Sequence, residues 1–253
     1  MIALTHTVSQ EINQCELSYL DRDPIDLELA VKQHDTYCRL LENHGLRVVE
    51  LSVNENFPDG TFIEDTAVVV DEIAVMTRPG AESRRGEIAG IEPELAKYRQ
   101  ISRITAPATL EGGDVLRIGR KLFVGHSPRT NREGVEAFRR IFLPFDYEVL
   151  PVNLKDCLHL KSAVTALDDQ MVLMNPNWLD QEPFRDYRIV EIDSEESWAA
   201  NVLCLPDCVV MHSGFTKTIE KVRSLEFQVE TVDISELQKA ESALTCSSIL
   251  IEE

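Results

Sequence analysis

One pattern of hydrophobic and polar residues recurs along the chain. A short run of β-branched or aliphatic residues is followed by a tight polar turn and then by a second aliphatic run, which is typical of a β-hairpin. The pattern occurs at residues 66–77, 115–124, 163–174 and 202–211, so that successive hairpins begin 49, 48 and 39 residues apart. Such a repeat predicts a fold built from similar units that pack on their neighbours.

The two ends of the chain carry the halves of a fifth hairpin. Residues 2–5 and residues 248–251 are both short, mostly aliphatic runs with the composition of strands. If the two runs pair, five units of about 50 residues each close into a ring. We expect such a ring to leave no free edge strand.

Segments with hydrophobic residues at helical spacing lie between the hairpins. Residues 27–44 form one, residues 131–142 form a second with Asn131 as its N-cap, and residues 216–225 form a third. A strand-like segment follows each of them, at residues 47–51, 147–152 and 227–232. The repeating unit is therefore hairpin, helix and strand. It predicts a single α/β domain over residues 1–253 with approximate five-fold symmetry.

Composition and charge narrow the classes of function. Hydrophobic residues make up 43% of the chain and charged residues 27%, which is ordinary for a globular protein. The 44 acidic and 25 basic residues give a net charge of −19. Phosphate backbones and anionic lipids repel such a chain, so we expect no nucleic-acid or membrane partner, whereas small cations are attracted. The N-terminal residues lack the basic region of a secretory signal, which favours a cytoplasmic protein.

The six cysteines do not form a recognisable framework. Cys15, Cys38, Cys157, Cys204, Cys208 and Cys246 are scattered, and there is no CxxC motif. The spacing is not that of a structural zinc site, and a cytoplasmic location disfavours disulfides. Most of these thiols are therefore expected to be reduced and buried, and a reactive one has to be identified from its neighbours.

Polar residues that could take part in catalysis or substrate binding lie just before each hairpin. Equivalent positions in a ring of repeats lie at one end of its axis, so these side chains are expected to meet although they are far apart in the sequence. The set comprises four carboxylic acids, an imidazole, an amide and a thiol: Asp59, Glu64, Asp65, Glu111, His159, Asn201 and Cys246.

This set can hold a flat cation and attack it. The Cys246 thiolate is a nucleophile for electrophilic carbon, His159 can serve as general acid and base, and Glu111 can orient the imidazole. The carboxylates of the first unit suit a guanidinium, which pairs bidentately with carboxylates and carries an electrophilic carbon. Each residue alone is a common structural feature. Their recurrence at one position of the repeat is what favours the chemistry.

Seven stretches of the sequence resemble one known family, and they occur in family order along nearly the whole chain. The chain resembles the dimethylarginine dimethylaminohydrolases, which belong to the guanidino-group-modifying (pentein) superfamily. The matching stretches are residues 57–66, 77–87, 110–116, 123–134, 158–162, 195–201 and 244–248. The resemblance implies a five-bladed α/β propeller of ββαβ-type units with pseudo-five-fold symmetry, in agreement with the repeat count.

The resemblance also implies an activity and the residues that perform it. It implies hydrolysis of Nω-methylated L-arginine to L-citrulline and a methylamine through a covalent thiouronium on Cys246, with no metal and no organic cofactor. His159 would be the general acid and base, and Glu111 would orient it. Asp65 would bind the guanidinium of the substrate, and Arg84 and Arg129 would bind its α-carboxylate. Further substrate contacts would come from Asp59, Glu64 and Leu17.

One departure from the family pattern lies beside the nucleophile. Members typically have Asp-Gly where this chain has Glu241 and Ser242. Glycine permits a left-handed backbone there, and Ser242 permits it less readily, so we expect an effect on the loop and on substrate choice.

Three alternatives remain open, and they differ in substrate or in class. The same thiol, imidazole and carboxylate would serve an arginine deiminase or an amidinotransferase, although those enzymes are typically longer. A binding protein on the same fold would lack the catalytic set, and a metal-dependent hydrolase would need histidine motifs that the sequence does not contain. Family members are often homodimers, and a homodimer is expected here.

Overall fold

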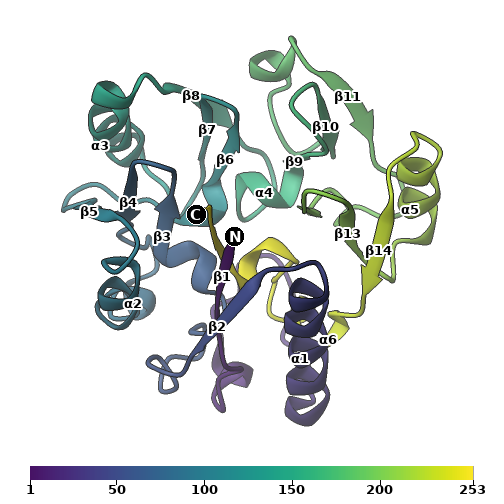
Figure 1. Ribbon diagram of the computed structural model, residues 1–253, viewed down its shortest axis with the longest axis horizontal. Helices are drawn as coiled ribbons and strands as arrows, with labels where there is room; N and C mark the ends of the chain where they lie inside the picture. Colours follow the sequence, from purple (N-terminus) through teal and green to yellow (C-terminus); the bar gives the residue numbers. More distant parts are fainter. Residues whose placement is uncertain (253) are drawn as a thin grey trace.

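The computed structural model describes residues 1–252 and consists of five small sheets arranged around a common centre (Figure 1). Each sheet has three strands. In sheet order the strands are β15 (Ile249–Ile251), β1 (Ile2–His6) and β2 (Arg47–Leu51); β3 (Ala67–Val69), β4 (Ile73–Met76) and β5 (Gln100–Arg103); β6 (Val115–Ile118), β7 (Lys121–His126) and β8 (Glu148–Asn153); β9 (Val164–Ala166), β10 (Met171–Met174) and β11 (Arg188–Glu191); and β12 (Leu203–Cys204), β13 (Val209–His212) and β14 (Val229–Val232).

All five sheets share one topology. The first two strands of each unit pair antiparallel as a hairpin, and the third strand joins the middle strand in parallel. The termini form the fifth hairpin as expected, because Ile2 pairs with Ile251 in the antiparallel register and with Arg47 in the parallel one. The five-fold α/β propeller is thereby confirmed.

The prediction that no edge strand stays free is wrong. The sheets are separate three-stranded units, so the ring closes by side-chain packing between sheets and not by hydrogen bonds between their strands. The middle strands are covered on both faces, and β1 and β4, for example, are buried along their whole length.

Helices connect the middle strand of a unit to its third strand and lie on the outside of the ring (Figure 1). The three expected helices are present as α1 (Leu27–Asn43), α3 (Arg132–Phe142) and α5 (Thr216–Arg223), and the Asn131 side chain caps α3 by accepting a hydrogen bond from the Gly134 N–H at 2.7 Å. The second unit adds α2 (Ile88–Leu95), which the hydrophobic pattern did not indicate. The fourth unit has only the 3-10 turn η6 (Glu182–Phe184) at this place.

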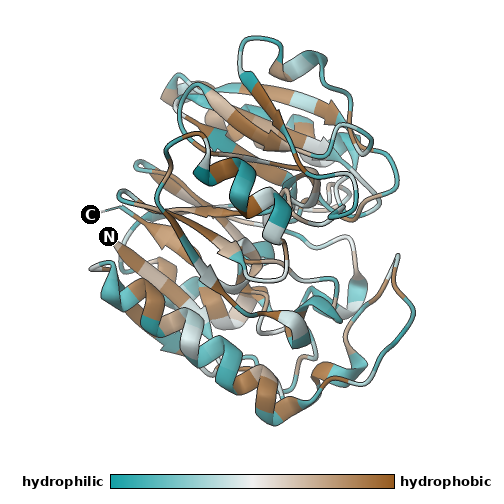
Figure 2. Cartoon of the chain, turned by 90° about the vertical axis from the view of Figure 1, so that its right-hand side faces the viewer, coloured by the Kyte–Doolittle hydropathy of each residue, from teal (hydrophilic) through white to brown (hydrophobic). Residues whose placement is uncertain are grey.

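The hydrophobic core is divided into five clusters that fill the spaces between neighbouring units. One cluster, for example, joins Ile2 and Leu4 of β1 to Ala74 and Met76 of β4. The strands are accordingly the most hydrophobic parts of the molecule, while the helices alternate between hydrophobic and polar positions (Figure 2). Burial of these side chains supplies the main stabilisation of the ring.

A short helical turn stands directly before the first strand of four units. These turns are η2 (Ile63–Thr66), η4 (Gly112–Asp114), α4 (Leu160–Ala163) and η7 (Thr245–Ser247), and η2 contacts η4 and η7 while α4 contacts η4. The segments that carry the chemically interesting residues therefore meet at one end of the ring, as the repeat predicts.

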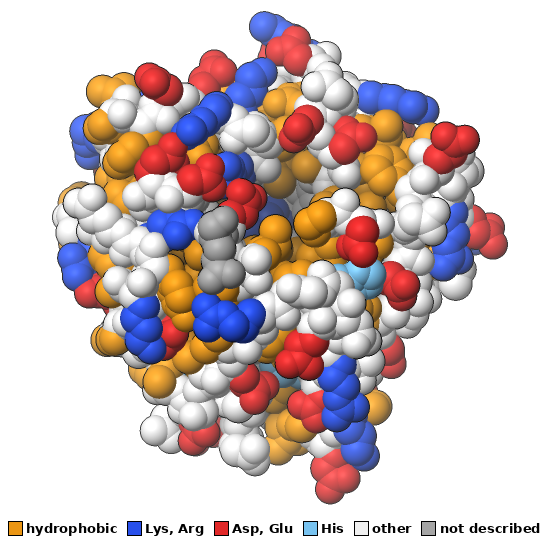
Figure 3. Space-filling model, viewed as in Figure 1, with side chains coloured by type: hydrophobic (Ala, Val, Ile, Leu, Met, Phe, Trp, Pro, Cys, Tyr) orange, Lys and Arg blue, Asp and Glu red, His pale blue; other side chains and the backbone are white. Residues whose placement is uncertain are grey.

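The surface mixes charges of both signs despite the net negative charge. On the face shown in Figure 3, Asp and Glu side chains alternate with Lys and Arg side chains around the rim. Within residues 1–252, no helix combines the length and the hydropathy needed to cross a bilayer.

Candidate active site

A narrow cavity with a volume of about 20 Å³ brings together most of the residues singled out in the sequence. Its lining includes the thiol, the imidazole, two acids and both arginines, which lie far apart in the sequence: Cys246, His159, Asp59, Asp65, Arg84 and Arg129. Glu111 is fully buried directly behind His159. Glu64 and Leu17 are not part of this lining.

His159 is the N-terminal neighbour of α4 and lies among acids. Its Nε2 is 2.7 Å from Oε2 of Glu111 and 3.9 Å from Oδ1 of Asp65. Burial by itself lowers the pKa of an imidazole, but the negative charge of Asp65 and the hydrogen bond to Glu111 outweigh burial and raise the pKa of His159 to about 9. The imidazole is therefore protonated at neutral pH and can donate a proton.

The turn before the first strand of the third unit needs glycine at position 113, because a side chain there would collide with His159 and Asp65. A Cβ atom at this position would lie 2.6 Å from Nδ1 of His159 and 2.8 Å from Oδ1 of Asp65. The Gly113 N–H instead donates a hydrogen bond of 2.9 Å to Oδ1 of Asp65. The Gly-Gly turn thus lets the backbone approach both groups closely and fixes their separation.

Asp65 is held ionised by its neighbours. Burial raises the pKa of this carboxyl, but the positive charges of His159 and Arg84, together with hydrogen bonds from Arg84 and Gly113, keep the pKa well below its usual range. Nη1 of Arg84 lies 2.6 Å from Oδ2 of Asp65. A permanent carboxylate in the cavity is suited to hold a cationic group.

The Arg84 guanidinium is largely committed to groups of the protein itself. Its Nε and Nη2 each donate to Glu87 at 3.0 Å, and Nη2 also donates to the Phe62 carbonyl at 3.1 Å. Burial raises the pKa of Glu87 to about 7 even though Arg84 pulls it down. Sequence reasoning missed Glu87, although its i,i+3 spacing from Arg84 within a matching stretch could have indicated the pair.

Arg129 has a freer guanidinium than Arg84. Its Nη1 is 3.5 Å from Oε1 of Glu111, and its Nη2 donates to the Ser18 hydroxyl at 3.3 Å. These contacts are longer than those of Arg84, so Arg129 retains more capacity to donate hydrogen bonds to an anionic group in the cavity.

Cys246 lies in η7 at the wall of the cavity. The Ala243 N–H donates to its Sγ at 3.4 Å. Burial and the negative charges of Glu64 and Asp65 raise the pKa of the thiol to about 12. Without a cation beside it, the thiol is therefore protonated at neutral pH.

Glu64 points to a different part of the molecule from Asp65. Its Oε1 is 2.5 Å from the Lys161 ammonium, and its Oε2 accepts a hydrogen bond of 2.8 Å from the Thr245 hydroxyl. Glu64 and Lys161 line another cavity, which does not contain Cys246 or His159. Glu64 therefore holds η7 in place through its hydrogen bond to Thr245. Its side chain does not line the cavity that contains Cys246, so its orientation does not support contact with the substrate.

The segment before α1 covers the cavity and is fastened by two carboxylates. Oε1 of Glu241 accepts hydrogen bonds from three consecutive backbone N–H groups, those of residues 18, 19 and 20, at 2.9, 2.5 and 2.6 Å. Oδ2 of Asp59 accepts from the Glu16 N–H at 3.1 Å. We call residues 16–20 the cover segment. Leu17 lies in it and packs against the core cluster between the first and fifth units.

A left-handed backbone does occur beside the nucleophile, and it lies at Glu241. Glu241 itself has φ +56°, whereas Ser242 is not among the residues with positive φ. The strain at Glu241 turns its buried carboxylate toward the cover segment. Sequence reasoning treated the substitution as a backbone change and missed this contact.

Asp114 is a second acid that the sequence analysis did not single out. It is fully buried, and it accepts hydrogen bonds from the Leu160 N–H at 3.0 Å and from the Ser127 hydroxyl at 2.6 Å. Burial raises the pKa of Asp114 to about 6. Because Leu160 follows His159 directly, Asp114 fixes the turn that presents the imidazole.

The arrangement has one plausible competitor to thiol chemistry, which is metal binding. One ligand atom each of Asp65, Glu111 and His159 lies within 4.8 Å of the others. Asp65 and His159 are, however, already engaged by Arg84 and Glu111. The atoms of Asp65, Glu111 and His159 are therefore better suited to bind a cationic substrate, which would lie between the Cys246 thiol and the His159 imidazolium.

Comparison with known proteins points in one direction. Residues 4–241 match the family model described as N,N dimethylarginine dimethylhydrolase, eukaryotic. The chain is 35% identical to the N(G),N(G)-dimethylarginine dimethylaminohydrolase of Pseudomonas aeruginosa, over 88% of this chain and 89% of that protein. It is 37% identical to the protein of the same name from Streptomyces coelicolor, over 99% of this chain and 97% of that protein.

Solved structures agree with the sequence comparison. A serine-for-cysteine variant of the Pseudomonas aeruginosa protein in complex with citrulline superposes with a TM-score of 0.91 at 32% identity, covering 98% of this chain and 97% of that one. A glycine-for-histidine variant of a dimethylarginine dimethylaminohydrolase, as an adduct with S-methyl-L-thiocitrulline, gives 0.92 at 33% identity, covering 98% of each chain. The N-terminal domain of the arginine dihydrolase ArgZ shares the fold, with a TM-score of 0.88 at 19% identity over 98% of this chain and 96% of that one.

Proposed function

The chain belongs to the dimethylarginine dimethylaminohydrolase family, and on that basis we propose that it hydrolyses Nω-methylated L-arginine, asymmetric dimethylarginine or monomethylarginine, to L-citrulline and a methylamine. The observation that carries the proposal is the single cavity lined by Cys246, His159 and Asp65, with Glu111 behind the imidazole. A thiol, an imidazolium and a fixed carboxylate are what the displacement of an amine from a guanidinium requires.

Substrate binding activates the nucleophile. In the free protein the Cys246 thiol is neutral, because burial and nearby carboxylates raise its pKa to about 12. A guanidinium held by Asp65 adds positive charge next to the sulfur, which favours the thiolate, and the thiol proton passes to solvent. We therefore expect the nucleophilic thiolate of Cys246 to form only when a cationic substrate is bound.

The first chemical step transfers the guanidinium carbon to sulfur. The Cys246 thiolate forms a bond to the central carbon, and the bond from that carbon to the methylated nitrogen breaks. His159, which is protonated at neutral pH, gives its proton to the departing amine. The product on the protein is a cationic S-alkylthiouronium.

The second step regenerates the cysteine. His159, now neutral, removes a proton from water, whose oxygen bonds to the thiouronium carbon. The carbon–sulfur bond then breaks and the hydroxyl on that carbon loses its proton to solvent, which leaves citrulline, the Cys246 thiolate and a protonated His159. Glu111 stabilises the imidazolium in both steps through its hydrogen bond of 2.7 Å.

The remaining polar groups bind the amino-acid part of the substrate. Arg129 is the better candidate for the α-carboxylate because its guanidinium is less occupied, whereas Arg84 positions Asp65. Asp59 lies in the same lining and is a candidate for a cationic group of the substrate. The cover segment then shields the bound substrate from water.

The test is a side-by-side assay of asymmetric dimethylarginine, monomethylarginine and arginine with detection of citrulline. We expect preferential turnover of a methylated substrate. Preferential turnover of arginine would instead assign a deiminase, and absence of citrulline from all three would remove the hydrolase proposal. Cys246→Ser is the control that identifies turnover as a property of this site.

Three further expectations accompany the proposal and have separate readouts. Folding as one domain predicts a single cooperative unfolding transition. A homodimer predicts twice the chain mass in light scattering. A cytoplasmic location predicts recovery in the cytosolic fraction of the source cells.

A further inference from the structure

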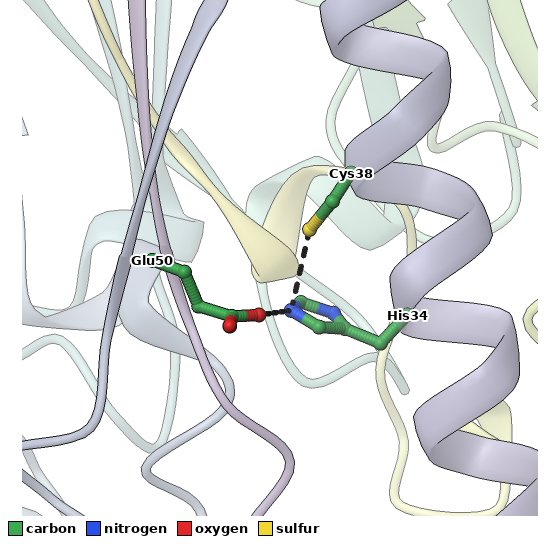
Figure 4. A group of neighbouring side chains, drawn as sticks. All are labelled: His34, Cys38 and Glu50. Atoms are coloured by element: carbon green, nitrogen blue, oxygen red, sulfur yellow. Dashed lines mark hydrogen bonds and ion pairs between the residues drawn. The ribbon is translucent and has the colours of Figure 1, made fainter.

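A second group of histidine, cysteine and carboxylate lies in the first unit. His34 and Cys38 are one turn apart on α1, and Glu50 lies on the neighbouring strand β2, with all three side chains directed at one another (Figure 4). Nε2 of His34 is 3.6 Å from Sγ of Cys38 and 3.9 Å from Oε1 of Glu50. None of these residues lines the cavity that contains Cys246.

The spacing of the three ligand atoms suits a tetrahedral zinc ion. Zinc binds nitrogen at about 2.0 Å, sulfur at about 2.3 Å and carboxylate oxygen at about 2.1 Å, so two ligands at the tetrahedral angle lie about 3.5 Å apart. The observed nitrogen–sulfur distance of 3.6 Å matches this value. The distance from Nε2 of His34 to Oε1 of Glu50, 3.9 Å, is slightly longer than this value. The Glu50 side chain is 43% exposed, however, and can move toward His34 and Cys38.

A surface cavity lies beside the group, on the side of His34 and Glu50. His34 is 1% exposed, and its Nδ1 is a buried polar atom without a hydrogen-bond partner, as is Oγ1 of Thr7. Both residues line a surface cavity together with Glu50, Asp35 and Glu55. This cavity offers an entry path, negative charge that attracts a cation, and space for a water molecule as fourth ligand.

A similar group elsewhere in the molecule lacks these properties. His44, Asp207 and Cys208 also have ligand atoms within 4.8 Å of one another. Sγ of Cys208, however, is 3.7 Å from both ring nitrogens of His44, so it is not aimed along the lone pair of either, and Nδ1 already pairs with the exposed Asp207 at 2.9 Å. Cys208 therefore serves as a matched control.

We propose that His34, Cys38 and Glu50 form a zinc site that ties helix α1 to strand β2. Zinc binds through Nε2 of His34, the Cys38 thiolate and a Glu50 oxygen, with water completing the tetrahedron. The Cys38 thiol gives its proton to solvent on binding, and no electron transfer is involved. A nitrogen, sulfur and oxygen set favours Zn²⁺ over the hard cations Mg²⁺ and Ca²⁺.

The experiment measures Zn²⁺ binding to the full chain in a Cys246→Ser background, which removes the active-site thiol as a competitor. A competition titration against a chromophoric chelator gives stoichiometry and affinity. Substitution with Co²⁺ gives a sulfur-to-cobalt charge-transfer band if a thiolate is bound. We expect one high-affinity equivalent and this band.

Three variants in that background locate the site. Cys38→Ser should abolish the charge-transfer band, and Glu50→Gln should weaken binding by more than the roughly 10- to 100-fold that loss of an outer-shell partner costs. Cys208→Ser should leave both measurements unchanged. Because Glu50 is half-exposed, Glu50→Gln is expected to fold even if changes at buried His34 do not. Affinity and spectrum that survive Cys38→Ser and Glu50→Gln, or that disappear with Cys208→Ser, would overturn the assignment.

Discussion

Two buried histidines, each beside a cysteine and a carboxylate, behave in opposite ways. His159 is 5% exposed and His34 is 1% exposed, so both have lost nearly all contact with water. Burial lowers the pKa of His34 to about 4, because the negative charge of Asp35 does not offset the loss of water around the ring. Around His159 the nearby carboxylates overcome burial and raise the pKa to about 9.

The difference shows that charge, and not residue type, separates a catalytic imidazole from a ligand. At neutral pH one ring is a cation that can protonate a leaving group, and the other is neutral with a lone pair available for a metal ion. A hydrogen bond of 2.7 Å to a carboxylate at one site, against a closest carboxylate at 3.9 Å at the other, accounts for much of this contrast.

The largest contrast is expected between the two cysteines. Cys246→Ser should lower turnover of a methylated arginine by at least ~10⁴-fold, because the nucleophile of a covalent mechanism is lost. Cys38→Ser should leave turnover close to that of the parent chain. Steady-state citrulline production measures both, and equal losses in the two variants would contradict the separation of the sites.

The next contrast concerns the carboxylate beside each histidine. Glu111→Gln keeps the shape but removes the charge that stabilises the His159 imidazolium, so kcat should fall by about 10²- to 10⁴-fold. The pKa of His159 should also fall, which moves the alkaline limb of the pH–rate profile to lower pH. Glu50→Gln is the matched change at the other site, and its profile should coincide with that of the parent.

Stability should depend on pH with opposite signs at the two sites. The folded pKa of His159, about 9, lies above its unfolded value of 6.5, so its contribution is full below pH 6.5 and is lost as pH rises toward 9. The folded pKa of His34, about 4, lies below 6.5, so its contribution is present above pH 6.5 and is lost as pH falls toward 4. Each slope is at most about 1.4 kcal/mol per pH unit.

Urea unfolding across this pH range separates the two contributions. His159→Gln should flatten the free energy of unfolding between pH 6.5 and 9, and His34→Gln should flatten it between pH 4 and 6.5. If either variant keeps the parent slope in its own window, the opposite charge states of the two rings are wrong.

The smallest effect is expected at the cover segment. Glu241→Gln replaces charge-assisted hydrogen bonds to three backbone N–H groups by neutral ones, at a cost of about 1 kcal/mol in closing the cavity. KM should rise a few-fold with little change in kcat, and the amides of residues 18–20 should exchange faster with deuterium. Glu236→Gln, which changes a carboxylate bound to the Asp26 N–H farther along, should leave those amides unaffected.

The ring and the main site could be predicted because their determinants are local. Hairpins are encoded by contiguous residues, and the repeat then places every residue before a hairpin at one end. Helix α2 was missed because Gly90 and Pro93 interrupt its eight residues, and the missing helix of the fourth unit could not be inferred from its neighbours.

The orientations of side chains could not be predicted in the same way. Glu64 and Asp65 are consecutive residues in a helical turn, so their side chains point in different directions, and only Asp65 lines the cavity. Glu241 contacts the cover segment across more than 220 positions of the sequence. His34 and Cys38 were assigned to an ordinary amphipathic helix, because their partner Glu50 lies on a strand whose register only the fold defines.

The central claim is that Cys246 carries the substrate carbon during turnover. The most direct test is mass spectrometry of protein quenched with acid while it turns over asymmetric dimethylarginine, followed by peptide mapping. The account predicts a modification on the peptide containing Cys246, equal in mass to the substrate less dimethylamine, alongside citrulline in solution. Citrulline formed with Cys246 unmodified at every quench time, and formed equally well by Cys246→Ser, would contradict it.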